Sequence, residues 1–268
     1  MSDDTTDATD ASTSRRHFLL GGAAVTGALA VPTAGVLGSN DPPQIQQVRE
    51  FRVRLENVSD GSTLQTSEGS KPVPMSPGAY AVHTADEPIF TPGEPERGNG
   101  LEEIAEDGAP PGKLAEALAA RDSVTDAGAF AVPTGADGPG PLLPGNDYEF
   151  TVEAAAGKPT RYLSLVTMFV QSNDVFLALG GADGLELFAD GEPNVGNVTD
   201  SLALWDAGTE INQEPGVGGH QAPRQRAKNV GDVERGTVAP IDEVNGYEYP
   251  AVDEVARLTV TPTGDGTD

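Results

Sequence analysis

The chain of 268 residues contains no cysteine. This absence excludes a disulfide framework, a metal site built from thiolates, and a lipid anchor attached through sulfur. The fold therefore forms without a disulfide bond.

Positive charge is also scarce. The sequence has 16 lysines and arginines against 42 aspartates and glutamates, which gives a formal net charge of −26 at pH 7. A surface of this kind repels nucleic acid and anionic lipid. We therefore expect no nucleic-acid partner.

Two interpretations of so acidic a composition compete. A disordered acidic chain needs low hydrophobicity, yet 37% of these residues are hydrophobic and they fall into strand-like patterns. A folded protein adapted to very high salt fits better, because concentrated salt shortens the Debye length to about 3 Å and suppresses self-repulsion. The composition favours a halophilic protein that loses its fold in dilute buffer.

The sequence also lacks the short motifs of common enzymes. It contains no HExxH and no G-x-S-x-G, P-loop or G-x-G-x-x-G segment in the strand and helix context that each requires. Two histidines, His83 and His220, lie beyond residue 40, and neither has a partner at metal-ligand spacing. We therefore expect no enzymatic activity. A secreted hydrolase that uses His83 or His220 with a nearby serine and aspartate remains the rival hypothesis.

The first 40 residues have the layout of an export signal. Ser14 to Leu20 reads SRRHFLL, a twin-arginine pattern preceded by a polar, acidic segment and followed by a run rich in glycine and alanine. That run is too short and too rich in glycine for a stable membrane span, which needs about 20 strongly apolar residues. We predict a twin-arginine signal peptide and linker at 1–40, a single domain at 45–262 and a disordered tail at 263–268. An uncleaved signal that tethers the protein to the membrane is the alternative.

Beyond the signal, the pattern is one of short strands. Phe51, Val53 and Leu55 alternate with charged residues, which indicates a half-buried strand, whereas 162–170 is nearly all apolar, as in a strand covered on both faces. Further strands are expected at 79–83, 129–132, 148–154, 175–179, 185–188, 202–205 and 255–260. Only 111–121 has clear helical spacing, with a single helical turn as a weaker signal at 101–106. The prediction is an all-β protein, an antiparallel β-sandwich with one short helix in a loop insertion.

Three acids are candidates for a metal site. Asp206 and Glu210 flank Gly208, which permits a tight bend that turns both carboxylates inward, and Asp174 ends the loop QSND between two predicted strands. A sandwich could place Asp174 beside Asp206. Because calcium takes six to eight oxygen ligands and no thiolate is present, Ca²⁺ is favoured over zinc or copper. Asn212 and Glu214 are weaker candidates. The alternative is that these acids belong to the solvated acidic surface.

Two neighbours of this loop have more than one interpretation. Trp205, the chain's only tryptophan, is expected to pack in the core rather than to contact a ligand. The segment QAPRQ at 221–225 either braces the ion loop through Arg224 and a carboxylate or leads into a strand.

In combination, several segments resemble the spondin N-terminal domain family, in the form found in single-domain microbial exported proteins. The matching segments are FRVRLENVS (51–59), MSPGAYAVH (75–83), IFTPGE (89–94), GPGPLLPGNDYEFTV (138–152), LSLVTMFVQSNDVFLAL (163–179), LALWDAGTEINQEPG (202–216), QAPRQ (221–225) and VARLTV (255–260). The resemblance implies a C2-like β-sandwich without enzymatic activity and with an ion site at one end. It assigns Asp174 to the aspartate of the SND loop, and Asp206 and Glu210 to the two acids of DAGT(D/E). Val175 departs from the pattern, because relatives often have tryptophan there.

The sequence thus predicts an exported, monomeric binding module that holds Ca²⁺ and recognises a ligand at the cell surface or in the matrix. A structural surface protein without a metal is the other alternative. The partner itself is not indicated, because the animal relatives of the family carry appended modules and cysteines that this chain lacks.

Overall fold

The computed structural model describes residues 48–84, 88–244 and 246–264. The predicted signal peptide and linker at 1–40 and the tail residues 265–268 lie outside the described residues. In the described part of the chain, no helix is long and apolar enough to cross a membrane.

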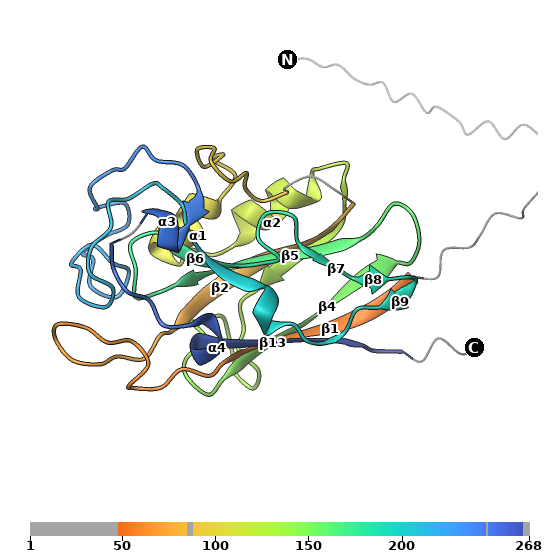
Figure 1. The fold of residues 1–268 in the computed structure, drawn as a ribbon, viewed down its shortest axis with the longest axis horizontal. Coiled ribbons are helices and arrows are strands. Elements are labelled where there is room, and N and C mark those ends of the chain that lie inside the picture. Colours follow the sequence, from red (N-terminus) through yellow and green to blue (C-terminus); the bar gives the residue numbers. More distant parts are fainter. Residues whose placement is uncertain (1–47, 85–87, 245, 265–268) are drawn as a thin grey trace, which may run out of the picture. The chain divides into compact units, whose positions relative to one another are not determined.

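The described residues form a β-sandwich with two main antiparallel sheets (Figure 1). The smaller sheet has the order β10-β13-β1-β4, and its strands are β1 (Val48–Asn57), β4 (Asp147–Ala155), β10 (Gly196–Asn197) and β13 (Ala256–Pro262). The larger sheet has the order β12-β11-β6-β5-β2-β3, with β7 also paired to β5. Its strands are β2 (Met75–His83), β3 (Val124–Phe130), β5 (Tyr162–Phe169), β6 (Val175–Leu179), β7 (Leu185–Glu186), β11 (Leu202–Asp206) and β12 (Ala239–Pro240). A separate small ribbon joins β8 (Phe188–Ala189) to β9 (Glu192–Pro193).

The main core lies between the two sheets. Phe51, Val53 and Leu55 of β1 project into it, as their alternation predicts, and pack with inward-facing residues of β5 and β6 such as Leu165 and Leu177. This arrangement confirms the predicted all-β sandwich and the period-two pattern of β1.

A second apolar cluster covers the other face of the larger sheet. Val166 and Met168 of β5 and Phe176 of β6 pack there against α1 (Leu101–Asp107) and α2 (Gly112–Ala119). Both faces of β5 are therefore buried, which explains its nearly continuous apolar sequence. Figure 1 shows the two helices on the side of β5 and β6 away from β1 and β13.

The helix predicted at 111–121 is present as α2, and the weaker helical signal at 101–106 corresponds to α1, but the structure contains more short helices than the one expected. The insertion between β2 and β3 contains both α1 and α2, and two one-turn helices, α3 (Ile241–Val244) and α4 (Val252–Val255), and the 3₁₀ turn Thr199–Ser201 lie further along the chain. α1 has seven residues, and such a short helix depends on tertiary packing more than on its own propensity. Its buried Leu101 and Ile104 supply that packing.

At the end of the domain, the chain remains attached to the sheet beyond β13. The Thr263 backbone N–H donates to the Glu50 carbonyl at 2.9 Å, and its hydroxyl donates to the Glu50 carboxylate at 2.6 Å.

Candidate metal site

Asp174 and Asp206 lie at the same end of the larger sheet. Asp174 directly precedes β6, and Asp206 is the last residue of β11, where it pairs with Val175. Because β6 and β11 are antiparallel, the beginning of one strand lies beside the end of the other. The sheet register therefore brings these two predicted site residues together.

A serine fixes the turn that carries Asp174. The Ser172 hydroxyl donates to the Phe169 carbonyl at 2.6 Å and accepts the Val175 backbone N–H at 3.1 Å, which closes the connection between β5 and β6. Ser172 and Asp174 are fully buried. Asp174 is therefore held on a rigid turn inside the protein and not on a mobile surface loop.

The bend after Asp206 requires a glycine. Gly208 has φ +70°, and a Cβ at this position would lie 2.7 Å from the backbone nitrogen of Thr237. Asp206 Oδ1 accepts the Gly208 N–H at 2.7 Å, which is the short local turn that aspartate often forms. The predicted tight bend at Gly208 is confirmed.

The two oxygens of the Asp174 carboxyl group have different environments. Oδ2 accepts the backbone N–H groups of Thr209 and Glu210, at 2.8 and 3.1 Å. Oδ1 is buried and has no hydrogen-bond partner. The loop after β11 thus wraps around one oxygen and leaves the other free, although a buried carboxylate oxygen is costly to leave unpaired.

The Asp206 carboxyl group forms a hydrogen bond with the side chain of Asn212. Its Oδ2 accepts the Asn212 side-chain N–H at 2.5 Å, while the amide oxygen of Asn212 is buried and has no partner. Two buried oxygens thus have no hydrogen-bond partner. One belongs to Asn212, which donates to the Asp206 carboxyl group, and the other belongs to Asp174, which accepts from the loop that follows Asp206.

The surroundings of Asp174 and Asp206 disfavour the ionised form of both carboxyl groups. Burial, and secondly the charge of Asp206, raise the pKa of Asp174 to about 8. Burial also raises the pKa of Asp206 above its ordinary value. Among the described residues, no lysine, arginine or histidine forms an ion pair with either group. Only neutral N–H donors, and no positively charged side chain of the described residues, stabilise the two negative charges when both are ionised.

Glu210 joins the pair through its main chain, while its carboxyl group lies elsewhere. A Cβ on Gly231 would lie only 0.9 Å from Glu210 Oε1, so the carboxyl group occupies the space beside that glycine. It lines a cavity of about 160 Å³ together with Glu106 and Asn229. Burial raises the pKa of Glu210 to about 7.

Glu106 is the acid that the sequence analysis missed. It lies in α1, is 6% exposed, and has its pKa raised to about 7 by burial and, less strongly, by the charge of Glu210. Nothing in the sequence distinguishes it from Glu102 and Glu103 in the same helix, because only the packing of α1 on the sheet decides which acid is buried.

Taken together, the described residues contain no group of three or more histidine, aspartate or glutamate side chains arranged around one point as metal ligands. The structure brings Asp174 and Asp206 together and places the Glu210 N–H on Asp174, but it directs the third carboxyl group into the neighbouring cavity. Glu214, the other weak candidate, accepts hydrogen bonds from the backbone N–H and hydroxyl of Ser67, at 2.6 and 2.7 Å.

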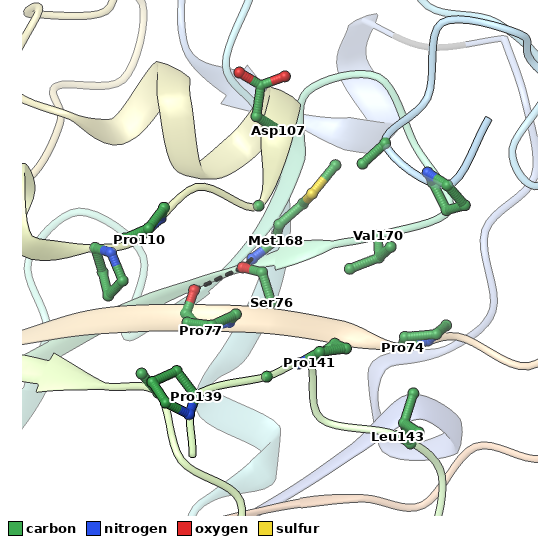
Figure 2. Close-up of a pocket in the computed structure, with 16 residues that line it drawn as sticks. Pro74, Ser76, Pro77, Asp107, Pro110, Pro139, Pro141, Leu143, Met168 and Val170 are labelled. Carbon is green, nitrogen blue, oxygen red and sulfur yellow. Dashed lines mark hydrogen bonds between the residues drawn. The ribbon is translucent and has the colours of Figure 1, made fainter. Parts of the chain in front are cut away.

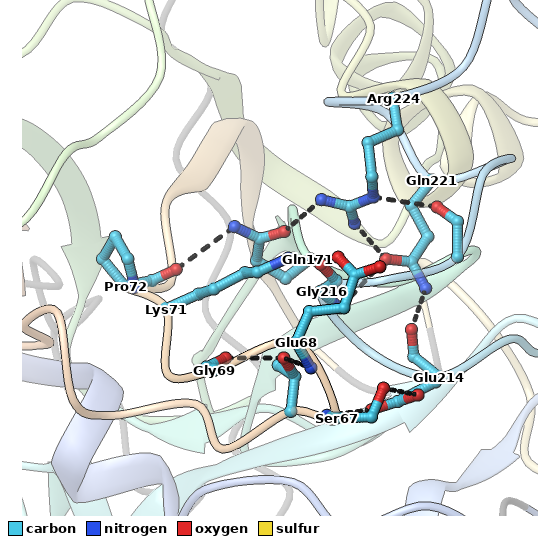
Figure 3. A network of polar contacts seen from close by, with 12 residues as sticks. Ser67, Glu68, Gly69, Lys71, Pro72, Gln171, Glu214, Gly216, Gln221 and Arg224 are labelled. Carbon is cyan, nitrogen blue, oxygen red and sulfur yellow. Dashed lines mark hydrogen bonds and ion pairs between the residues drawn. The ribbon is translucent and has the colours of Figure 1, made fainter.

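Gln221 and Arg224 brace the loops around the site (Figure 3). The Arg224 guanidinium donates to the Gly218 carbonyl at 2.9 Å, to the Gln171 side chain at 3.0 Å, and to Gln221. These acceptors are neutral oxygens, so the expected brace is present but does not use a carboxylate. No strand begins directly after 221–225.

Gln221 is the centre of this brace. It is fully buried, accepts the Gly216 N–H at 3.0 Å and donates to the Glu214 carbonyl at 2.8 Å and to the Asn173 side chain at 3.3 Å. Since Asn173 directly precedes Asp174, this one amide ties the Asp174 turn to the loop that follows the site.

Trp205 packs in the core as predicted. Its ring lies 4.9 Å from that of Phe90, in the cluster between the larger sheet and the helices.

The histidines of the rival hydrolase hypothesis have different surroundings. His83 Nε2 lies 2.9 Å from the hydroxyl of Ser164, and both residues are buried. Gly184 covers the pair, because a Cβ there would lie 2.7 Å from the Ser164 hydroxyl. His220 is half-buried in the braced loop, where its backbone N–H donates to the Gln213 side chain at 3.0 Å.

A scan of the chain against protein-family models finds no match, and a search of curated proteins finds no significant relative. The resemblance to the spondin N-terminal domain family stays a prediction that depends on the sequence motifs.

Proposed function

We propose that the chain is an exported, non-enzymatic binding module that holds a calcium ion between the turn at Asp174 and the loop after β11. The observation that carries the proposal is the buried, unpartnered Oδ1 of Asp174 beside a second buried carboxylate, Asp206. A divalent cation would supply the missing partner and offset both charges.

The available donors suit calcium. Asp174 and Asp206 offer carboxylate oxygens, and Asn212 offers a buried amide oxygen without a partner. Glu210, whose N–H already donates to Asp174, is the third proposed carboxylate; its carboxyl group would have to turn out of the space beside Gly231 to reach the ion. Because all of these donors are oxygens, the set favours a hard cation that accepts six to eight ligands.

When bound, calcium would supply positive charge and fix the ends of two loops. Asp174 and Asp206 would hold the ion, and the hydrogen bonds of Gln221 and Arg224 fix the positions of the surrounding loops. A coordination position not filled by the protein would accept an oxygen atom from a surface or matrix ligand outside the cell. The twin-arginine pattern of residues 14–20 supports export.

Calorimetric titration tests this function. We expect saturable calcium binding, one ion per chain, by the full-length protein in molar KCl at about pH 8.5, above the pKa of Asp174. Asp206→Asn should weaken binding at least about tenfold, because it removes one ligand charge. Glu214→Gln is the matched control, since Glu214 bonds to Ser67 in the adjoining loop and should leave calcium binding unchanged.

The outcomes separate the alternatives. Absence of saturable heat from a protein that circular dichroism shows to be folded would exclude the calcium site and leave a structural surface protein.

The hydrogen bond between His83 and Ser164 is the observation that favours a hydrolase. We propose instead that this pair is part of the packed interior, because Gly184 lies against it. Hydrolysis of a p-nitrophenyl ester that disappears in both Ser164→Ala and His83→Gln would establish the hydrolase.

A further inference from the structure

An apolar cavity of the described residues is lined by none of the candidate calcium ligands. It has a volume of about 610 Å³ and is bounded by β2, the end of α1, the loop at 139–143 and the end of β5. Figure 2 shows Met168 and Val170 on one side, with Pro77, Pro139 and Pro141 across from them. A cavity of several hundred cubic ångströms that is mostly apolar is typical of a small-molecule site.

The lining offers very few hydrogen-bond donors. Seven of the sixteen lining residues are prolines, which have no backbone N–H. Among the others, the N–H groups of Gly108, Gly140, Met168 and Val170 already donate within the protein. The Ser76 hydroxyl donates to the Pro77 carbonyl at 2.7 Å. An anionic ligand would therefore find few donors here, whereas an apolar group needs none.

Negative charge is concentrated at one edge of the same cavity. Asp107, at the end of α1, is the only charged lining residue. Its charge is among those that raise the pKa values of Glu106 and Glu210, which line the separate cavity of about 160 Å³. In Figure 2 the Asp107 carboxyl group stands at the rim and is directed away from the apolar residues. One oxygen accepts a hydrogen bond from Gln225 at 2.8 Å.

We infer that this proline-lined cavity binds a small organic cation, an aromatic or alkyl amine, with its apolar body among Pro77, Met168 and Val170 and its ammonium group at the rim beside Asp107. Charge complementarity selects this class, because the only charge at the cavity is negative and the whole chain carries −26. The inference is independent of the calcium proposal, since none of the proposed calcium ligands lines this cavity.

A matched pair of fluorescent probes tests the inference. Dansylcadaverine carries an amine, and dansyl-6-aminohexanoate carries a carboxylate on a similar chain. Both are titrated into the full-length protein at the lowest salt concentration at which circular dichroism shows it folded. We expect saturable, blue-shifted emission from the amine, with an affinity about threefold or more above that of the acid, the size expected for one exposed ion pair.

Variants locate the binding. Val170→Trp or Leu143→Trp fills the cavity and should abolish the emission change; Leu143 is 48% exposed, so its substitution is the milder one for folding. Val195→Trp, at an exposed position that lines none of the cavities described here, is the control and should bind like the wild type. Asp107→Asn should retain dansyl binding but lose the preference for the amine.

Three results would overturn the inference. These are the absence of saturable emission from the wild type, unchanged binding in both cavity-filling variants, and equal affinity for the amine and the acid. Sedimentation provides a further check, because a wild-type dimer that Leu143→Trp converts to a monomer would assign the cavity to a second copy of the chain.

Discussion

Asp174 directly precedes β6, and Asp206 ends the neighbouring antiparallel strand β11; the charge of Asp206 contributes, after burial, to a pKa of about 8 for Asp174. The loop after Asp206 also folds over Asp174, because the N–H groups of Thr209 and Glu210 donate to one oxygen of its carboxyl group. The two residues thus form one electrostatic unit with an unpartnered buried oxygen.

The first prediction concerns pH. Because the folded-state pKa of Asp174 is raised to about 8, and those of Glu106 and Glu210 to about 7, the folded protein binds more protons than the unfolded chain between about pH 4 and pH 8. Their contribution to stability is fully present below the unfolded pKa values and is lost as the pH rises through the folded ones. In the presence of a chelator, we therefore expect the melting temperature to fall from about pH 5 to about pH 8.5.

Two comparisons accompany this experiment. Asp174→Asn removes one of the titrating groups and should flatten the decline with pH. Calcium should oppose the decline, since it binds the ionised carboxylates and stabilises the folded state by mass action. A melting temperature that rises across this pH range in the chelated wild type would contradict the assignment.

The second prediction concerns the brace around the site. Gln221→Leu removes the hydrogen bonds of a fully buried amide and leaves the Gly216 N–H and the Glu214 carbonyl without this partner. We expect the free energy of unfolding to fall by about 2 to 4 kcal/mol, measured by urea denaturation in high salt.

Gln225→Leu is the matched control for Gln221. Gln225 is half-buried, and its side chain donates to Asp107 at 2.8 Å. We expect this change to cost about 1 kcal/mol or less. Equal effects of the two substitutions would show that Gln221 has no special role.

The third prediction concerns the space that Glu210 occupies. An alanine side chain at position 231 would overlap the Glu210 carboxyl group, so Gly231→Ala should displace that group toward solvent. The pKa of Glu210 should then fall from about 7 toward an ordinary value of about 4.3, as measured by carbon-detected NMR titration.

Gly219→Ala serves as the control for this substitution, because a Cβ at Gly219 has no neighbouring atom within 4 Å. It should leave the Glu210 titration unchanged. A Glu210 pKa that stays near 7 in Gly231→Ala would mean that burial in this cavity is not its cause.

The fourth prediction concerns salt. With a formal charge of −26, the chain repels itself in dilute buffer, and concentrated salt removes that repulsion. We expect a far-UV circular dichroism spectrum typical of β-sheet in molar KCl, and we expect this signal to disappear at low ionic strength. Identical spectra in both conditions would contradict adaptation to high salt.

The fold was predictable where one local pattern decided it. The alternation of Phe51, Val53 and Leu55 and the apolar sequence of β5 each follow from which faces of a strand are buried, and both predictions are confirmed. The helix α1 was not predictable as a full helix, because its stability comes from the packing of Leu101 and Ile104 on a sheet formed by distant segments.

The candidate site was predictable in part for the same reason. Gly208 and the turn at Asp174 are local features, and the register of β6 and β11 brings Asp174 and Asp206 together. The direction of the Glu210 side chain depends on Gly231, and the burial of Glu106 depends on the packing of α1. Neither relationship can be predicted from the spacing of the acids in the sequence.

Terbium luminescence tests the calcium site most directly, because Tb³⁺ takes the same oxygen ligands as calcium and emits when a nearby tryptophan absorbs light. Trp205 is the chain's only tryptophan and directly precedes Asp206. We predict tryptophan-sensitised terbium emission, which calcium abolishes by displacing the terbium ion. The emission should disappear in Asp174→Asn, which loses the site. It should also disappear in Trp205→Phe, which loses the sensitiser but still binds calcium. Sensitised emission of equal strength in the wild type and Asp174→Asn, or no emission from the folded wild type, would contradict a cation held between Asp174 and Asp206.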